Sequence, residues 1–254
     1  MKNIKIIIAT HKNYKMPNDG LYLPLQVGAE GKPDIGYQTD NTGENISKKN
    51  PYYCELTGLY WAWKNLDCDY LGLAHYRRHF KGKSFPFKEK FKSILTEPQL
   101  EKKLKKCDVL LPKKRHYYIE TNRSQYLHAH HEIGLIETEN IIKKYYPDYL
   151  DSWNRVMKKK SGHRFNMFIM KKTLADKYCL WLFDILEKVE ERIDLSEWDK
   201  SEQRVFGYLS ERLLDVWLDK NNIDYKDIKY MFMEKQIWIK KGWNFIRRKF
   251  KAKS

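Results

Sequence analysis

The sequence predicts an α/β domain in which a mostly parallel sheet is flanked by helices. Short continuous apolar runs alternate along the chain with longer segments whose apolar residues recur at helical spacing. Hydrophobic residues make up 42% of the 254 residues and aromatic residues 15%. That composition supplies a sizeable core and excludes a chain that is disordered throughout. The chain has no internal repeat and no low-complexity linker, so we expect one domain at 1–234 followed by a basic tail at 235–254.

The predicted strands are short apolar runs bounded by polar or turn-forming residues. They are expected at 4–9, 70–74, 108–111 and 165–170, with a weaker strand near 23–27. The run at 4–9 opens directly into polar residues, as a buried parallel strand does when its carboxyl end faces a ligand site. Residues 13–50 are rich in Gly, Pro, Asn and Asp and are expected to form long loops, which in compact domains are often functional.

The predicted helices each keep their apolar residues on one face. They are expected at 51–65, 97–106, 133–146, 149–159, 174–192 and 203–220. Pro51 suits the first turn of a helix, because its missing N–H would have no partner there. The segment 113–165 is expected to be mostly helical. Helices of this kind would cover the two faces of the predicted sheet.

The charge balance indicates an anionic partner. Lys and Arg total 49 against 33 acidic residues, which gives a net charge of +16. Nucleic acid, an acidic lipid surface and phosphorylated small molecules all fit that charge. Half of it lies in 235–254, where eight residues are basic and none is acidic.

Several classes of protein are excluded or disfavoured at this stage. No apolar run reaches the ~18 residues that a transmembrane helix needs. The apolar run at the N-terminus is too short for a signal peptide and lacks a cleavage site. The four cysteines lie far apart, without the spacing of a metal site: Cys54, Cys68, Cys107 and Cys179. We therefore expect reduced thiols and a cytoplasmic location.

The segment after the predicted strand at 70–74 carries His75, Arg77 and Arg78. Guanidinium groups match phosphate oxygens bidentately and neutralise charge that develops on a leaving group. Two arginines and an imidazole at the open end of a strand therefore fit a diphosphate. Taken alone, adjacent arginines in a basic protein more often form a surface ion-pair cluster, and that alternative stays open.

Two further segments have both functional and structural interpretations. Residues 40–47 form a polar turn whose acceptors fit a base or ribose, although the segment alone favours an ordinary turn before a helix. Residues 128–132 place three histidines beside a glutamate, but His128 and His130 diverge by about 200° on a helix, which disfavours a metal site. A single histidine that contacts phosphate is the better hypothesis.

The predicted helix at 203–220 offers candidates for a general base. Arg204, Tyr208 and Glu211 fall on one helical face, and Asp199 precedes it. Either Asp199 or Glu211 could accept a proton at a cleft. The alternative is a capping aspartate and a structural Arg–Glu pair.

The basic tail has the pattern of a helix at a membrane surface. Its apolar residues recur at helical spacing among lysines and arginines, and Gly242 weakens the helix by about 1 kcal/mol. The expected membrane contacts are Trp238, Trp243, Arg247, Arg248, Lys249 and Phe250. The alternative is a helix that packs on its own domain with a solvated basic flank.

Taken together, the motifs resemble the bacterial glycosyltransferases of capsular and exopolysaccharide biosynthesis whose domain was long described as of unknown function. The matching stretches lie between residue 6 and about 218: Ile8–Lys12, Asp40–Ser47, Tyr53–Thr57 running into Tyr60-Trp61, Gly72–Phe80, Asn166–Met170 and Arg204–Leu213. The resemblance implies a GT-A-like fold and transfer of a hexose from a nucleoside diphosphate sugar. Because some relatives are thought to transfer galactofuranose, it suggests a uridine diphosphate donor.

The resemblance also implies roles for single residues. The nucleotide-sugar contacts would be Thr10, His11, Lys12, Asp40, Asn45, His75, Arg77, Arg78, His130, Asn166 and Arg204. In an inverting mechanism, Asp199 is the first candidate for the base and Glu211 the second. Many GT-A enzymes hold a divalent metal with an Asp-x-Asp motif after the central strand, but here Asp67-Cys68-Asp69 precedes that strand. We therefore expect no metal cofactor, with the arginines stabilising the diphosphate.

The acceptor that the resemblance implies is an oligosaccharide on a polyprenyl diphosphate. The basic tail would then hold the enzyme at the inner face of the bacterial cell membrane. Two rival functions remain: a basic nucleic-acid-binding protein and a non-catalytic peripheral membrane protein. The first lacks a recognised DNA or RNA motif, so we expect no nucleic-acid partner. A non-catalytic membrane protein would not need the cationic residues that follow the predicted strand at 70–74.

Overall fold

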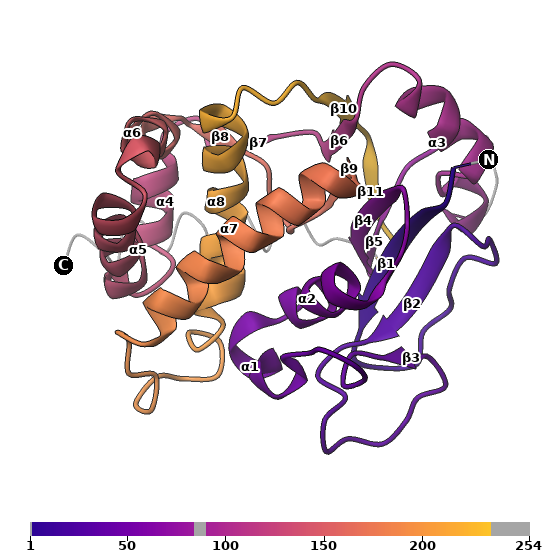
Figure 1. Cartoon of the computed structure of the whole chain (residues 1–254), viewed down its shortest axis with the longest axis horizontal. Coiled ribbons are helices and arrows are strands. Elements are labelled where there is room, and N and C mark those ends of the chain that lie inside the picture. Colours follow the sequence, from indigo (N-terminus) through magenta and orange to yellow (C-terminus); the bar gives the residue numbers. More distant parts are fainter. Residues whose placement is uncertain (1, 84–89, 235–254) are drawn as a thin grey trace.

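A nine-stranded sheet forms the centre of the computed structural model, which describes residues 2–83 and 90–234 (Figure 1). The strands of this sheet are β1 (Ile4–Thr10), β2 (Tyr22–Gln26), β3 (Gln38–Thr39), β4 (Tyr70–His75), β5 (Arg78–Phe80), β6 (Val109–Pro112), β9 (Phe168–Lys171), β10 (Lys226–Ile228) and β11 (Tyr230–Phe232). A separate two-stranded sheet joins β7 (Arg115–His116) to β8 (Ser161–Gly162).

The strand order is β10-β6-β9-β4-β1-β2-β3, with β5 paired to β4 and β11 paired to β5. Parallel pairing joins β1 to β2 and β4, β2 to β3, and β6 to β10. Only β9 runs antiparallel within this order, between β4 and β6. The predicted class, a mostly parallel sheet flanked by helices, is confirmed.

The helices lie on both faces of the sheet. They are α1 (Asn50–Tyr53), α2 (Leu56–Asn65), α3 (Glu97–Leu104), α4 (Asn122–Leu127), α5 (Glu132–Tyr145), α6 (Leu150–Lys158), α7 (Lys172–Glu190) and α8 (Val205–Lys220), with single 3₁₀ turns at η1 (Ser47–Lys49), η2 (Lys90–Ser93) and η3 (Pro147–Tyr149). Figure 1 shows α7 running beside the sheet toward a group formed by α4, α5, α6 and α8. Within the described ranges, no helix is both long enough and apolar enough to cross a bilayer.

Two apolar clusters fill the two faces of the sheet. Successive residues of a strand point to opposite faces, so Ile7 of β1 joins one cluster while Ile6 and Ile8 join the other. The first cluster is covered by α2, α5, α6, α7 and α8. The second is covered by α3 through Leu100 and Leu104. Burial on both faces explains why these strands are continuously apolar rather than alternating.

The sequence prediction differs from the structure at two places that matter for the site. The helix expected at 51–65 is broken at Cys54, whose φ of 54° is left-handed, so Glu55 begins a new helix. The strand expected at 165–170 begins only at Phe168, because Phe165 and Asn166 have φ values of 76° and 55°. Such conformations are costly for residues with a Cβ, and they gather at functional sites.

Candidate active site

The carboxyl ends of β1 and β4 lie side by side and carry two histidines. Ala9 is opposite His75 in the parallel register, so His11, two residues further on, emerges at the same edge. Tyr76 is buried between them, with its ring centroid 4.5 Å from that of His75 and 5.3 Å from that of His11. The polar residues that follow the two strands therefore lie at the same end of the sheet.

Both imidazoles are neutral at physiological pH. Burial, and then the charges of Arg78 and Arg77, lower the pKa of His75 to about 2. Burial and the neighbouring Lys12 also lower the pKa of His11. The Nδ1 atom of His75 accepts a hydrogen bond from the Arg77 backbone N–H at 3.2 Å. A neutral imidazole that accepts at Nδ1 carries its proton on Nε2, so His75 can donate one hydrogen bond to a ligand.

Arg77 and Arg78 follow His75 and are held by aromatic rings rather than by acids. Arg77 lies over the Tyr76 ring at 5.2 Å, and Arg78 lies over the Phe165 ring at 4.2 Å. The Nε atoms of both arginines are buried without a hydrogen-bond partner. Neither arginine forms an ion pair with a carboxylate in the part of the chain that the structure describes. An anion would accept the hydrogen bonds that these buried guanidinium groups do not make within the protein, and two such groups match a diphosphate.

A carboxylate, Glu55, lies within electrostatic range of Arg78. The break between α1 and α2 at Cys54 turns Glu55 toward β9, where its Oε1 accepts a hydrogen bond from Asn166 Nδ2 at 3.0 Å. Burial is the main cause that raises the pKa of Glu55, and the charge of Glu211 adds to it while Arg78 opposes it. A carboxylate with a raised pKa suits a general base near neutral pH.

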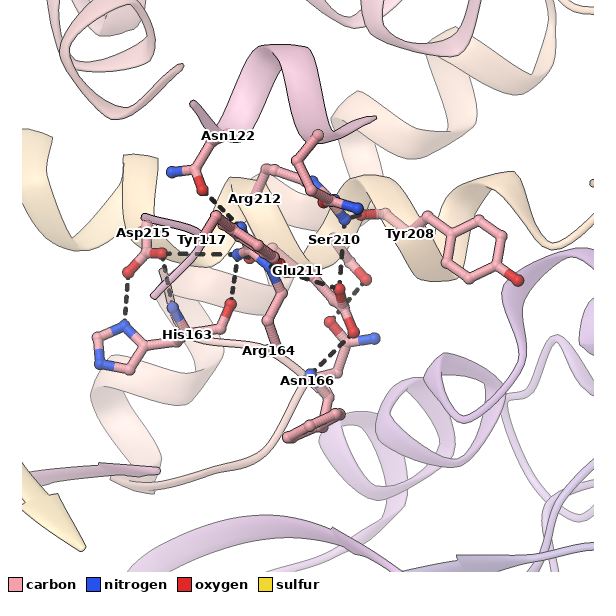
Figure 2. A network of polar contacts seen from close by, with 12 residues as sticks. Tyr117, Asn122, His163, Arg164, Asn166, Tyr208, Ser210, Glu211, Arg212 and Asp215 are labelled. Carbon is pink, nitrogen blue, oxygen red and sulfur yellow. Dashed lines mark hydrogen bonds and ion pairs between the residues drawn. The ribbon is translucent and has the colours of Figure 1, made fainter. Parts of the chain in front are cut away.

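The position of Asn166 is fixed at both ends of its amide. Its Nδ2 also donates to the Gly207 carbonyl at 3.1 Å, and its Oδ1 accepts from Ser210 Oγ at 2.8 Å (Figure 2). These contacts hold Asn166 in its left-handed conformation and aim it at Glu55. Asn166, which the sequence assigned to the sugar or acceptor, thus lies beside the base candidate.

Glu211, the second candidate for the base, is engaged by the protein. Its Oε1 accepts from the Phe165 N–H at 2.8 Å, and its Oε2 lies 3.2 Å from Arg212 Nη1 and 3.9 Å from Arg164 Nε. Figure 2 shows this glutamate in the middle of a polar network that reaches His163 and Asp215. The arrangement fits the structural Arg–Glu alternative and leaves Glu55 as the freer carboxylate.

Arg204 and His130 lie at the rim of the same site. The Nε atom of Arg204 is 3.1 Å from the Sγ atom of Cys54, and burial raises the pKa of that thiol to about 11, so it stays protonated. His130 stacks on Tyr208 with ring centroids 3.9 Å apart. Both residues therefore remain candidates for contacting a phosphorylated ligand.

Three predicted ligand contacts are bonded to the protein itself. Asp40 is buried, and its carboxylate accepts from the Gly28 and Ala29 N–H groups and from the Ser47 and Thr57 hydroxyls, at 2.5–3.0 Å. The amide of Asn45 bonds locally to Gly43 and Ser47 and is exposed. This geometry matches the alternative of an ordinary structural turn. Thr10 is likewise buried and bonds to the backbone of Lys12, whose ammonium lies over Tyr76.

Asp199, the first candidate for the base, is exposed in the loop before α8. Its Oδ1 accepts from the Ser201 N–H at 2.7 Å, the Ser201 hydroxyl at 2.9 Å and the Glu202 N–H at 3.0 Å. These bonds lower its pKa, which weakens it as a proton acceptor. Its contacts match the capping alternative, so we no longer take Asp199 as the base.

The Asp67-Cys68-Asp69 motif lies at the amino-terminal ends of β1 and β4, as the sequence predicted. Asp69 accepts from the Asn3 N–H at 2.7 Å, beside the start of β1. Among the described residues, no three His, Cys, Asp or Glu side chains gather in an arrangement that could hold a metal ion. Metal independence of a reaction at this site remains a prediction for experiment.

Sequence reasoning missed Glu55. The residue belongs to the stretch Tyr53–Thr57 that carried part of the family resemblance, but it sat within an apparently continuous helix. Only the left-handed Cys54 reveals that a new helix begins there and turns the carboxylate toward Asn166. The aromatic support of Arg78 by Phe165 was also hidden, because it needs residues far apart in sequence.

Comparison with known proteins places the chain in a family. The family model described as "Domain of unknown function (DUF4422)" matches residues 5–222. The chain belongs to this family. This DUF4422 chain is also similar to the solved apo structure of WbbM, described as a bifunctional glycosyltransferase, with 31% sequence identity and a TM-score of 0.84. The similarity covers 92% of this chain and 46% of WbbM, so the chain spans about half the length of that protein. No curated protein matches the chain.

Proposed function

We propose that this protein is a glycosyltransferase that transfers a sugar from a nucleoside diphosphate donor to a glycan acceptor. The observation that carries the proposal is the pair Arg77 and Arg78, whose Nε atoms are buried without a hydrogen-bond partner. Both arginines interact electrostatically with His75, and Arg78 also interacts with Glu55. Such a site offers cations for a leaving diphosphate and a carboxylate for an acceptor proton. Similarity to a bifunctional glycosyltransferase over nearly the whole chain supports the same conclusion.

The arginines act on the donor. Their guanidinium groups bind the diphosphate and neutralise the charge that develops on it as its bond to the anomeric carbon breaks. His75 donates its Nε2 proton as a hydrogen bond to a phosphate oxygen. His11 and Lys12 lie where the nucleoside would enter, beside the end of β1. A uridine diphosphate hexose, with galactofuranose as a candidate sugar, is the donor we favour.

Glu55 acts on the acceptor. Its carboxylate accepts the proton of an acceptor hydroxyl, whose oxygen then attacks the anomeric carbon while the nucleoside diphosphate leaves. Asn166 orients Glu55, and the raised pKa of the carboxylate matches it to this task. Attack from the side opposite the diphosphate inverts the configuration. We favour Glu55 over Glu211, because Glu211 is held by a backbone N–H and two arginines.

The cellular setting is also part of the proposal. We place the enzyme at the cytoplasmic face of the cell membrane, with a polyprenyl-diphosphate-linked oligosaccharide of capsule or exopolysaccharide synthesis as its acceptor. The basic tail at 235–254 lies outside the described residues, and its binding to an anionic membrane rests on its sequence alone. Deleting residues 236–254 should weaken binding to anionic vesicles. Unchanged binding would remove the tail from the proposal.

The decisive experiment is a calorimetric titration of the protein with uridine diphosphate, with and without manganese. We expect binding that does not require the metal, and loss of binding in Arg78→Ala. Arg155→Ala is the matched control, since Arg155 of α6 is exposed and pairs with Asp219 of α8. Binding that requires manganese would overturn the metal-independent mechanism while keeping the transferase. Absence of binding to any nucleoside diphosphate would overturn the proposed function.

A further inference from the structure

A second cationic feature begins at Lys81, directly after β5. A groove of about 560 Å³ opens between α3, β6 and β10, and the segment that follows β5 forms its wall. Eight lysines line it against one acid, Asp227, among them Lys102, Lys103 and Lys106 of α3 and Lys226 of β10. Figure 1 shows these elements gathered at one end of the sheet.

The ammonium groups of this lysine groove are not neutralised. None of the eight lysines forms an ion pair within 4 Å with a carboxylate of residues 2–83 or 90–234, and all but Lys81 are exposed. Elsewhere the protein pairs its lysines readily, as in Lys49 with Glu190 at 2.7 Å and Lys143 with Glu139 at 2.7 Å. Like charges crowded together repel one another, so the groove favours an anionic partner.

The composition of the lysine groove indicates what kind of anion it takes. Among the residues that the structure describes, its lining contains no arginine and no aromatic ring. Arginine forks read planar phosphate and base groups, and aromatic rings stack on exposed bases, so a nucleic-acid groove normally has one or both. Lysines are flexible point charges on long apolar stems, which meet many phosphates without a fixed geometry. The headgroups of an anionic bilayer present phosphates in that way.

The position of the lysine groove links it to the active site. β5 pairs with β11, so that Phe232 lies opposite Arg78 and Tyr230 opposite Phe80. One residue further on, the Lys81 N–H bonds to the Lys229 carbonyl at 2.7 Å, at the wall of the groove. Arg78 and Lys81 are three residues apart, which is about 10 Å along a strand. A surface bound at the groove would therefore lie beside the site.

We propose that the lysine groove is a docking surface for anionic phospholipid headgroups. It binds a bilayer by charge, independently of the tail, and so holds the edge of the sheet that carries Arg78 close to the membrane. Its value for a lipid-borne acceptor rests on the proposed function, whereas the binding itself does not. Because the attraction is electrostatic, it weakens as salt is added.

The test is sedimentation of the full chain with vesicles of phosphatidylcholine, with and without phosphatidylglycerol. The variant replaces Lys102, Lys103, Lys106 and Lys226 by glutamine. The matched control carries the same change to glutamine at four exposed lysines away from the groove: Lys158, Lys160, Lys177 and Lys200. We expect the groove variant to bind anionic vesicles at least about tenfold more weakly than the control, since each lysine near such a surface contributes appreciably. Arginine at the same four groove positions should restore binding.

Other outcomes would overturn the proposal. Equal loss in the groove variant and the control would assign the binding to net charge, and no loss would assign it to another surface, including the tail. Displacement of vesicles by inorganic phosphate at concentrations too low to screen charge would indicate a free-phosphate site. Tighter binding of a duplex RNA than of vesicles would indicate a nucleic-acid surface. Calorimetry with uridine diphosphate on the same variants separates this proposal from the transferase, because the groove lysines do not contact the proposed donor.

Discussion

Two pairs of arginines in this protein have different contacts around their guanidinium groups. Arg164 and Arg212, in the network of Figure 2, are buried and bonded to the protein: Arg164 donates to Tyr117, His163 and Asn122, and Arg212 donates to Tyr208, Glu211 and Gln125. One guanidinium nitrogen of this pair, Arg212 Nε, is buried without a hydrogen-bond partner. Arg77 and Arg78 lie against aromatic rings, with no acceptor for Nε.

The difference indicates what each pair is for. A buried cation that donates to several protein acceptors is part of the structure, and removing it leaves those acceptors unpaired. A cation held by ring faces keeps its N–H groups available, at a cost to stability, and that cost is recovered when an anion binds. We therefore assign the first pair to holding the site and the second pair to binding the ligand.

The largest expected effect is on stability, from Arg164→Ala. The change removes the hydrogen-bond donor of Asn122 Oδ1 and of the Tyr117 hydroxyl, and it removes a cation beside Glu211. We expect the free energy of unfolding to fall by about 3–5 kcal/mol, as when one partner of a buried charged network is removed. Urea denaturation followed by circular dichroism measures it. A loss of less than about 1 kcal/mol would contradict the structural assignment.

Arg78→Ala should show the reverse pattern. Transfer should fall by about 10²- to 10³-fold, the usual effect of deleting a group that stabilises developing charge. The free energy of unfolding should change by less than about 1 kcal/mol, since the Arg78 side chain contacts the Phe165 and Phe232 rings and no carboxylate of the described residues. Steady-state kinetics and urea denaturation on the same preparation check both halves. Destabilisation equal to that of Arg164→Ala would break the comparison between the two pairs.

Glu55→Gln tests the carboxylate that faces the ligand arginines. We expect kcat to fall by about 10²-fold, while Asn166 keeps an acceptor to bond, so the fold is preserved. Because a base must be deprotonated, kcat/KM of the unaltered enzyme should fall as the pH drops through the raised pKa of Glu55. That acidic limb should be absent from the residual rate of Glu55→Gln. Glu211→Gln is the control, and it should keep the limb while losing stability.

The sequence predicted the ligand arginines better than the carboxylate. Apolar runs ending in polar residues place His75 and Arg78 at a sheet edge without any knowledge of long-range contacts. Glu55 depends on the left-handed Cys54, and Asn166 on a second left-handed turn, neither of which has a local signal because no glycine marks them. The saturation of Asp40 by four donors was equally hidden, because three of the four come from residues more than ten positions away.

The smallest expected effect concerns the histidines beside the two arginine pairs. His163 is paired with Asp215 at 2.5 Å, whereas His75 lies among cations and its folded-state pKa is lowered to about 2. The unfolded chain binds a proton at His75 near pH 6.5 and the folded chain does not, so stability is lost as the pH falls below 6.5. One such histidine contributes about 1 kcal/mol of loss between pH 6.5 and about pH 5.5. His75→Gln should remove that part of the acid sensitivity in urea denaturation. Unchanged acid sensitivity in this variant would mean that burial and the charges of Arg78 and Arg77 do not hold His75 neutral. The neutral form of His75 in the proposed mechanism would then be contradicted.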